Sequence, residues 1–269
     1  MLTRASFSER FGRRAVFGMV HLKPLPGAPL FDGSLDRVID AALRDARAIA
    51  AGGCDGVVVE NFGDRPFYAT RVPPETIAAM TRVIGSLSEI RLPFGVNVLR
   101  NDARAALAIA AATGAAFIRV NVHVGAMVTD QGIIEGDAAE TLRYRARVAP
   151  DVAIFADYLV KHASPLGPQS AKDLRERGLA DAIIITGAET GVAADPLRLS
   201  ELRRTVDAPI LIGSGIDENN AATFADADGV IVGTALKRDG KVDQSLVERV
   251  IRAFKMGSDL TPIKSRGGR

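Results

Sequence analysis

The chain has 269 residues, of which 47% are hydrophobic and 25% are charged, and its formal net charge is +2. This composition suits a globular protein with a large core, and a charge near zero gives no general reason to expect nucleic acid or an acidic membrane surface as a partner. There is no apolar run of the ~20 residues that span a bilayer, no signal-peptide pattern, and one cysteine only, Cys54. We therefore expect a cytoplasmic protein, and the composition is compatible with a homo-oligomer.

Eight short apolar runs alternate along the chain with Ala-, Arg- and Glu-rich stretches of helical character. The predicted strands are Val16–Val20, Gly56–Glu60, Phe94–Val98, Phe117–Asn121, Val152–Asp157, Ala182–Thr186, Pro209–Gly213 and Gly229–Gly233. The predicted helices are Leu35–Ala51, Pro74–Ile90, Asp102–Thr113, Asp137–Val148, Ala171–Arg177, Pro196–Val206, Glu218–Ala225 and Asp243–Phe254. Near-continuous Val and Ile runs are typical of parallel strands buried on both faces. Eight such units predict an α/β fold, the (β/α)8 TIM barrel, which usually needs about 250 residues.

We expect one barrel domain over residues 1–256, followed by a polar, disordered tail over residues 257–269. Two segments interrupt the regular alternation. A proline-rich segment, His21–Pro29, follows the first strand, and a glycine-containing segment, Val122–Gly136, follows the fourth. Because both come directly after strands, both should lie at the catalytic end of the barrel, where long loops usually act as lids or binding loops.

The last two predicted strands each end in glycine next to a hydroxyl-bearing residue. These two loops contain Gly213, Ser214, Gly215, Gly233 and Thr234. Glycine at the end of a buried strand leaves main-chain N–H groups open to an anion, and the last two strands of (β/α)8 barrels commonly hold a phosphate in this way. The loop after the sixth strand has the same character, with Thr186, Gly187 and Thr190. The sequence therefore predicts a phosphorylated small molecule as ligand.

Polar or ionisable residues stand at almost every predicted strand end, where barrel active sites are built. They include His21, Glu60, Asn97, Arg119, Asn121, His123, Asp157, Lys161 and His162. The spacing of two between Arg119, Asn121 and His123 predicts that all three face the mouth of the barrel. A single buried polar residue often belongs to a structural hydrogen-bond network, but so many charges gathered at one end favour a functional site.

Three chemistries can be compared for this site. Glu60 and Asp157 are the best carboxylate pair for proton transfer, with His21 or His162 as the histidine partner, while Asn97, Arg119, Asn121 and Lys161 would bind substrate. The same acids and histidines could offer mixed ligands to a divalent metal, but no metal-binding spacing occurs, so no cofactor and no metal site is predicted. No lysine ends a strand inside the barrel, which argues against Schiff-base chemistry, and Cys54 precedes a strand as a core residue would.

Several segments together resemble the BtpA/SgcQ family across nearly the whole chain. They are Val20–Gly27, Glu60–Asp64, Gly95–Asp102, Arg119–Asn121, Thr129–Gly132, Glu135–Gly136 and Lys161–His162. The resemblance implies a barrel related to the ribulose-phosphate-binding barrels. It also implies a link to photosystem I biogenesis, with which the family's namesake is associated in cyanobacteria, while other members are labelled nucleoside triphosphatases or sit among sugar-uptake functions. It carries over no catalytic residue.

Two functions of different classes follow. The first is an enzyme that acts on a sugar phosphate or nucleotide-like compound by acid/base isomerisation or bond cleavage, as an isomerase, lyase or hydrolase. The second is a non-catalytic assembly factor for a membrane complex such as photosystem I. Nucleoside triphosphate hydrolysis is disfavoured because the chain lacks a GxxxxGK[ST] loop. A scaffold would not need both an ionisable rim and a phosphate loop pair, so the residues favour the enzyme.

Overall fold

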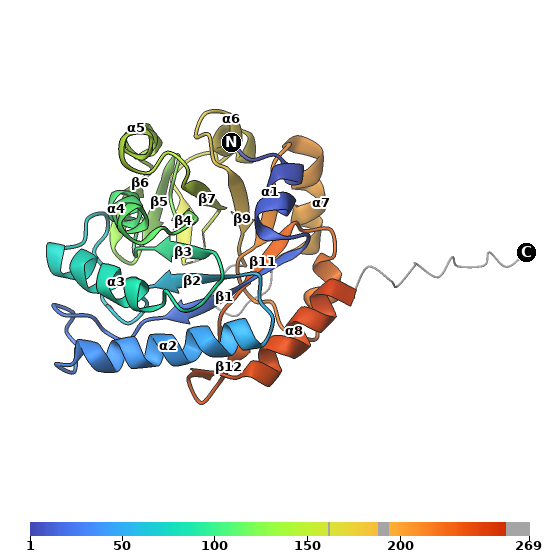
Figure 1. Ribbon diagram of the computed structural model, residues 1–269. Coiled ribbons are helices and arrows are strands. Elements are labelled where there is room, and N and C mark those ends of the chain that lie inside the picture. The colour runs from blue at the N-terminus through green and yellow to red at the C-terminus, as the bar shows by residue number, and fades with distance from the viewer. Residues whose placement is uncertain (161, 188–193, 257–269) are drawn as a thin grey trace, which may run out of the picture.

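The computed structural model describes residues 1–160, 162–187 and 194–256, and within them eight parallel strands close into a barrel (Figure 1). In order around the barrel the strands are β1 (Ala15–His21), β2 (Gly56–Glu60), β3 (Phe94–Asn97), β4 (Phe117–Val120), β7 (Ala153–Tyr158), β9 (Ala182–Ile185), β10 (Ile210–Ile212) and β11 (Gly229–Val232). The barrel closes where β1 pairs with β11: Phe17 of β1 lies opposite Gly56 of β2 on one side and opposite Ile231 of β11 on the other. The predicted (β/α)8 barrel is confirmed.

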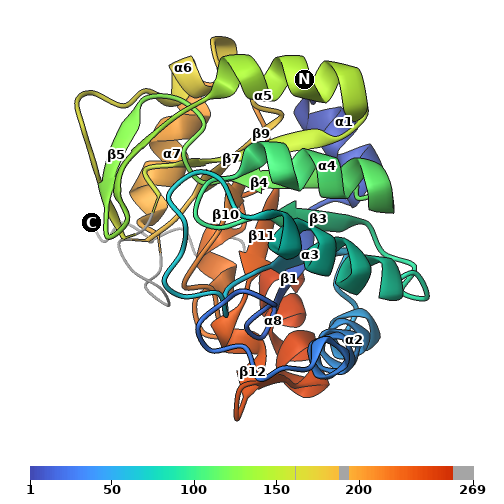
Figure 2. The same cartoon turned by 90° about the vertical axis from the view of Figure 1, so that its left-hand side faces the viewer.

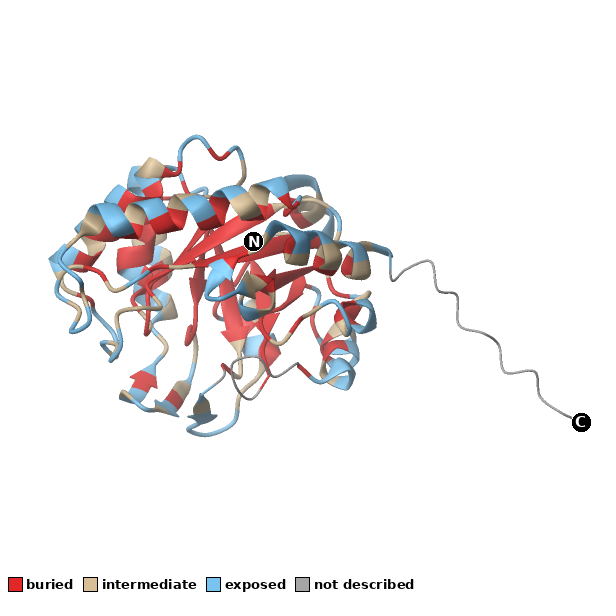
Figure 3. Ribbon diagram, turned by 90° about the horizontal axis from the view of Figure 1, so that it is seen from below, coloured by how far each residue is buried: buried red, intermediate tan, exposed pale blue. Residues whose placement is uncertain are grey.

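Helices cover the outside of the barrel, with buried inner faces and exposed outer faces (Figure 3). They are α2 (Leu35–Ala51), α3 (Pro74–Ser86), α4 (Ala103–Thr113), α5 (Ala138–Val148), α6 (Ala171–Glu176), α7 (Pro196–Thr205) and α8 (Gln244–Met256). Side-chain oxygens of Ser34, Asp102 and Ser170 cap the first turns of α2, α4 and α6, and so satisfy N–H groups that have no partner inside the helix. None of the described helices is both long and apolar enough to cross a bilayer.

Two predicted helices differ from those observed by more than two residues at one end. Helix α3 ends at Ser86 rather than Ile90. Between β10 and β11 the predicted helix Glu218–Ala225 is a single 3-10 turn, η1 (Ala221–Phe224). The side chain of Asn220 explains the second difference: its amide oxygen accepts a hydrogen bond from the main-chain N–H of Asp217, and its Nδ2 donates to the main-chain oxygen of Gly215. Such local side-chain bonds compete with the helical pattern and favour a turn.

A short helix that the sequence pattern does not predict, α1 (Arg4–Phe11), closes the end of the barrel opposite the strand carboxyl ends. Phe7 and Phe11 are buried against the barrel interior, and Phe11 meets Phe117 edge to face, with ring centroids 5.6 Å apart. Because aromatic side chains fill this end of the barrel, a ligand can reach the interior polar residues only from the other end.

The long segment after β4 is not an irregular loop. It forms a hairpin of β5 (Ala126–Thr129) and β6 (Gly132–Glu135), and β8 (Ala163–Pro165) adds a third antiparallel strand. Figure 2 shows β5 at the edge of the molecule, apart from the barrel strands. Met127 and Ile134 pack with Val122 and Val160 in a small apolar cluster that holds this sheet in place. A second hairpin, β12 (Lys237–Arg238) with β13 (Lys241–Val242), follows β11.

Candidate functional site

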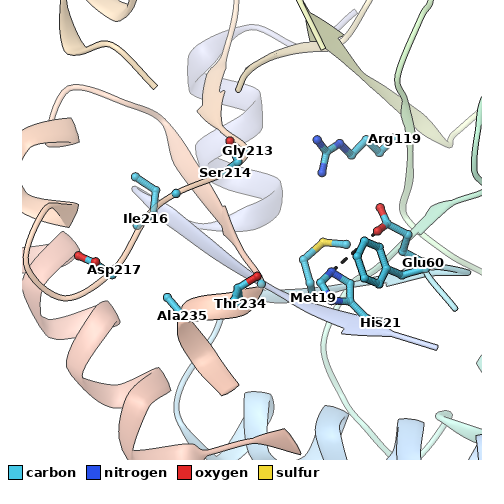
Figure 4. A pocket seen from close by; sticks show the side chains of 13 residues that line it. Met19, His21, Glu60, Arg119, Gly213, Ser214, Ile216, Asp217, Thr234 and Ala235 are labelled. Carbon is cyan, nitrogen blue, oxygen red and sulfur yellow. Dashed lines mark ion pairs between the residues drawn. The ribbon is translucent and has the colours of Figure 1, made fainter. Parts of the chain in front are cut away.

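A cavity of about 200 Å3 opens at the carboxyl ends of β1, β2, β10 and β11. Its lining residues are Met19, His21, Glu60, Phe62, Arg119, Gly213, Ser214, Gly215, Ile216, Asp217, Gly233, Thr234 and Ala235. The two glycine loops form one side of the cavity, and the side chains of Arg119, Glu60 and His21 converge on the other (Figure 4). The structure thus brings together the five residues of the predicted phosphate loops and three of the predicted side chains.

The glycines at this cavity are required by the backbone and by packing. Gly215 has φ +68°, a left-handed conformation that other residues adopt only with strain. A Cβ on Gly213 would lie 2.3 Å from Cγ2 of Ile184, and one on Gly233 would lie 3.1 Å from Cε1 of His21. The main chain can therefore approach the barrel interior closely only because these positions are glycine. The loop that contains Gly233 lies directly against His21.

The loop after β9 is joined to the first glycine loop. The Gly187 N–H donates a 2.8 Å hydrogen bond to the Ser214 hydroxyl, and the Thr186 hydroxyl donates to the main-chain oxygen of Leu159. The predicted Thr186–Gly187 pair therefore supports the loop that carries Ser214. Lys161 and Thr190, which were also predicted to bind substrate, lie outside the described residues.

His21 and Glu60 end two adjacent strands at the same level, because β1 and β2 pair with His21 opposite Glu60. The Nε2 atom of His21 lies 3.8 Å from Oε1 of Glu60, and the ring of Phe62 stacks on the imidazole at 4.5 Å between centroids. The aromatic contact fixes the plane of the imidazole and directs Nε2 towards the carboxylate. A carboxylate and an imidazole are thus held side by side in the cavity wall.

Lys237 is a functional candidate that sequence reasoning missed. Its Nζ lies 2.8 Å from Nδ1 of His21, although the two residues are 216 positions apart in the chain. Burial lowers the pKa of the Lys237 ammonium, with Asp45 and Glu60 acting in the opposite direction. A charged ammonium can only donate, so this contact favours the tautomer in which Nδ1 accepts and Nε2, the atom that faces Glu60, carries the hydrogen. The signal in the sequence was a lysine four residues after the last strand-end glycine.

Arg119 and Asp157 form a buried ion pair with two parallel hydrogen bonds. Nε and Nη2 of Arg119 donate to the two Asp157 oxygens over 2.9 and 3.0 Å, and Nδ2 of Asn121 donates to Oδ2 over 2.8 Å. The amide of Asn97 donates to the side-chain oxygen of Asn121. Burial acts to lower the pKa of Arg119, but the charges of Asp157 and Glu60 outweigh burial and raise it. Arg119 is therefore a permanent cation at the cavity wall.

The predicted acid Asp157 occupies a different position from Glu60. Its side chain is 0% exposed, and both oxygens accept hydrogen bonds from Arg119 or Asn121. A carboxylate engaged in this way is suited to orienting a guanidinium rather than to exchanging protons with a ligand. Of the two carboxylates in the predicted pair, only Glu60 is a lining residue of the described cavity.

A second cavity of about 560 Å3 adjoins the first and shares Glu60, Phe62 and Arg119 with it. Its other lining residues are Arg65, Phe67, Leu99, Arg100, Asn121, Asp130 and His162. The predicted catalytic histidine His162 is therefore at the mouth but on this second cavity, whereas His21 lies on the first. Asp130 comes from the turn between β5 and β6, so the small sheet supplies part of the wall.

His123 does not face the mouth, and that expectation is wrong. Strand β4 ends at Val120, so the alternation of faces stops before His123 is reached. Nε2 of His123 instead lies 2.7 Å from the main-chain oxygen of Gly178, and burial lowers the pKa of the imidazole. Cys54 is buried, as expected of a core residue, and burial raises the pKa of its thiol to about 12.

Metal binding finds no support among the residues described. No three His, Cys, Asp or Glu side chains there are grouped so that they could hold an ion. The four candidate ligands separate instead, since His21 and Glu60 line the first cavity, Asp157 is bonded to Arg119, and His162 lines the second cavity.

The geometry defines a (β/α)8-barrel protein whose polar cavity lies at the carboxyl ends of the strands. The chain belongs to the BtpA family, whose model matches residues 12–256. It is 48% identical over 264 residues to the photosystem I biogenesis protein BtpA of Synechocystis sp., covering 93% of this chain and 91% of that protein. It is 38% identical over 250 residues to the sgc region protein SgcQ of Escherichia coli, covering 88% and 92% respectively.

Solved structures of the same fold are distant in sequence. Thiamine phosphate pyrophosphorylase of Pyrococcus furiosus is 14% identical with a TM-score of 0.59, covering 91% of this chain and 96% of that one. The 7,8-dihydropteroate synthase of Vibrio fischeri is 16% identical with a TM-score of 0.61, covering 94% and 95%. At these identities the likeness concerns the barrel architecture alone.

Proposed function

We propose that this protein is an enzyme that uses acid/base chemistry on a phosphorylated small molecule, a sugar phosphate or a nucleotide-like compound. One observation carries the proposal: a carboxylate and an imidazole, Glu60 and His21, line the same cavity as two glycine loops suited to an anion. Proton-transfer groups and an anion site only a few ångströms apart are what catalysis on a phosphate ester requires.

In the proposed mechanism the phosphate group lies against the loops that carry Gly215 and Thr234. Glu60 accepts a proton from the bound substrate, and the Nε2–H of the neutral His21 donates a hydrogen bond to a substrate oxygen. Arg119 faces the same space and would stabilise negative charge that develops on that oxygen. Asp157, Asn121 and Asn97 hold the guanidinium in place. Isomerisation and elimination both begin with this proton abstraction.

Lys237 is expected to keep His21 neutral, with the hydrogen on Nε2. In the Lys237→Met variant we expect His21 to take up a proton at higher pH than in the wild type, because a neighbouring positive charge that opposes protonation is gone. Nitrogen-15 NMR of the imidazole rings checks this, since only three histidines are present. The Lys237→Arg variant, which keeps the charge, should retain the wild-type tautomer. An unchanged titration of His21 in Lys237→Met would contradict this role.

Phosphate binding by the glycine loops can be tested with a matched pair of glycine variants. Gly215 and Gly240 have φ +68° and +75°, so alanine at either position costs roughly 1–2 kcal/mol of backbone strain. Gly240 lies in the β12–β13 turn, where an added Cβ would meet no other atom within 4 Å. We expect Gly215→Ala to lose the thermal stabilisation that phosphate esters confer, whereas Gly240→Ala retains it. Equal stabilisation of both variants would place the anion elsewhere.

A non-catalytic assembly role is the second candidate, and the name of the 48% identical Synechocystis protein favours it. An assembly factor would need its outer surface, while the residues of the mouth could be replaced without effect. An experiment can therefore distinguish the enzymatic function from the assembly function. If a chromosomal copy with Glu60→Gln supports normal levels of the membrane complexes whose abundance falls when the protein is deleted, and no phosphate ester is turned over, the assembly role replaces the enzymatic one.

A further inference from the structure

A third cavity, of about 280 Å3, lies beside the second one, and neither the glycine loops nor the proposed acid/base pair makes use of it. Its walls come from the loops after β1 and β2 and from the start of α3, and it meets the second cavity at Phe67 and Leu99. Small-molecule sites usually have volumes of roughly 300–1,000 Å3, so this space has the size for a single ring rather than for a larger ligand.

Most of the wall residues have apolar side chains, and they are Phe67, Tyr68, Leu99, Pro29, Pro66 and Pro73. The walls are tied to neighbouring loops, because the main-chain oxygen of Tyr68 accepts a hydrogen bond from the N–H of Arg100, and Asp64 accepts one from the N–H of Leu25. Tyr68 is nevertheless 58% exposed, which leaves apolar surface that a ligand could cover. A flat apolar group in this cavity would therefore gain free energy from burial.

Asp64 is the one charged residue among the described residues that line this cavity. Its Oδ1 accepts a 2.8 Å hydrogen bond from the N–H of Leu25, its Oδ2 accepts a 3.1 Å bond from Nδ2 of Asn61, and no cation of the described chain pairs with it. Burial raises the pKa of Asp64 more than these two bonds lower it. A carboxylate has about four acceptor sites, so Asp64 can still accept hydrogen bonds from a ligand.

The hydroxyl of Thr76 is a second polar group at this wall. Thr76 lies in the first turn of α3 and is only 5% exposed, yet within the described part of the chain its hydroxyl has no hydrogen-bond partner. A buried hydroxyl without a partner costs free energy, which a polar atom of a ligand would recover. The cavity thus combines apolar walls with a carboxylate and a hydroxyl that both have hydrogen-bonding capacity left.

We propose that the third cavity binds a planar ring that carries paired N–H donors, such as an aromatic amidine or the amino-substituted edge of a nitrogen heterocycle. The ring would lie against Phe67 and Tyr68, and its N–H groups would donate to the Asp64 carboxylate as a guanidinium does to an acid. An anionic ring would be disfavoured by the charge of Asp64. This site is separate from the glycine loops and does not depend on a phosphate being bound there.

Three small probes test the inference in the wild-type protein. Benzamidine and benzoate share the ring and differ in charge, whereas benzamidine and acetamidine share the amidinium and differ in the ring. Titrations followed by NMR of the main-chain amides of residues 64–68 should show benzamidine binding at least about tenfold more tightly than either of the other two. Charge-assisted hydrogen bonds and burial of the ring are each large enough to give this difference.

Two variants assign the preferences to residues. Asp64→Asn should reduce the preference for benzamidine over benzoate towards one, and Phe67→Ala should do the same for the preference over acetamidine. Asp36→Asn is the control and should keep both preferences, since Asp36 is an exposed acid paired with Arg82 on the outer helices. If Asp64→Asn does not fold, the wild-type titrations and Phe67→Ala still decide the question.

Each of the opposite results would overturn the proposal. Equal affinities of the wild type for benzamidine and benzoate would show that Asp64 does not select the ligand, and equal affinities for benzamidine and acetamidine would show that no ring is bound. A preference that survives in folded Asp64→Asn, or the absence of any shift at residues 64–68, would place the binding elsewhere. None of the probes carries a phosphate, so these results leave the test of the glycine loops independent.

Discussion

Replacing Glu60 with glutamine is expected to lower kcat by about a hundred- to ten-thousandfold, the usual contribution of a general base. The change keeps the size and shape of the side chain but removes the group that accepts the proton. Glu60 lines both the first and the second cavity, and its Oε1 lies 3.8 Å from Nε2 of His21. Among the described carboxylates of the first cavity, it is the one paired with the imidazole. Turnover of a ligand found by thermal-shift screening of phosphorylated metabolites is the measurement.

Two controls make the Glu60 result interpretable. Glu89→Gln changes an exposed carboxylate that pairs with Arg47 on the outer surface, and its turnover should equal that of the wild type. The thermal stability of Glu60→Gln should stay close to that of the wild type, which would show that the loss is chemical. Wild-type turnover by a folded Glu60→Gln protein would remove Glu60 from the mechanism and leave it a structural role.

Replacing Asp157 with asparagine is expected to lower the free energy of unfolding by about 3–5 kcal/mol. The change leaves the guanidinium of Arg119 buried without its negative partner, and a broken buried pair is costly because one charge stays desolvated. Glu176→Gln in the exposed pair with Lys172 is the matched control, for which the loss should be below about 0.5 kcal/mol. Urea unfolding of the three proteins gives both values.

The outcome at Asp157 also decides between two roles for this residue. The sequence suggested proton transfer, whereas three hydrogen bonds to its oxygens favour positioning of Arg119. A double-mutant cycle with Arg119→Gln should give a coupling energy of roughly 1–3 kcal/mol, as for residues in one buried network. If Asp157→Asn instead keeps full stability and loses turnover as Glu60→Gln does, proton transfer becomes the better assignment.

Much of the fold was predictable because its signals are local. Runs such as Val57–Val59 and Ile183–Ile185 have the length of strands and are buried on both faces. A continuous apolar run of this kind can be recognised as a buried strand without knowledge of the rest of the chain. The prediction of a helix over Glu218–Ala225 failed for an equally local reason, since the Asn220 side chain bonds to the main chain of Gly215 and Asp217 and competes with the helix. The phosphate-loop residues follow strands directly, and the barrel alone brings them to one end.

Local patterns in the chain were enough to predict the eight strands, most of the helices, the glycine loops and the end of the barrel at which polar residues gather. Which polar residues meet became visible only in the folded molecule: Lys237 contacts His21 where β1 and β11 close the barrel, and Asp157 pairs with Arg119 instead of lining the first cavity. It also decided that α1 fills the opposite end of the barrel with Phe7 and Phe11. Burial and periodicity can be read from a few neighbouring residues. The partners of these side chains depend on strand register and barrel closure, which bring together residues far apart in the chain.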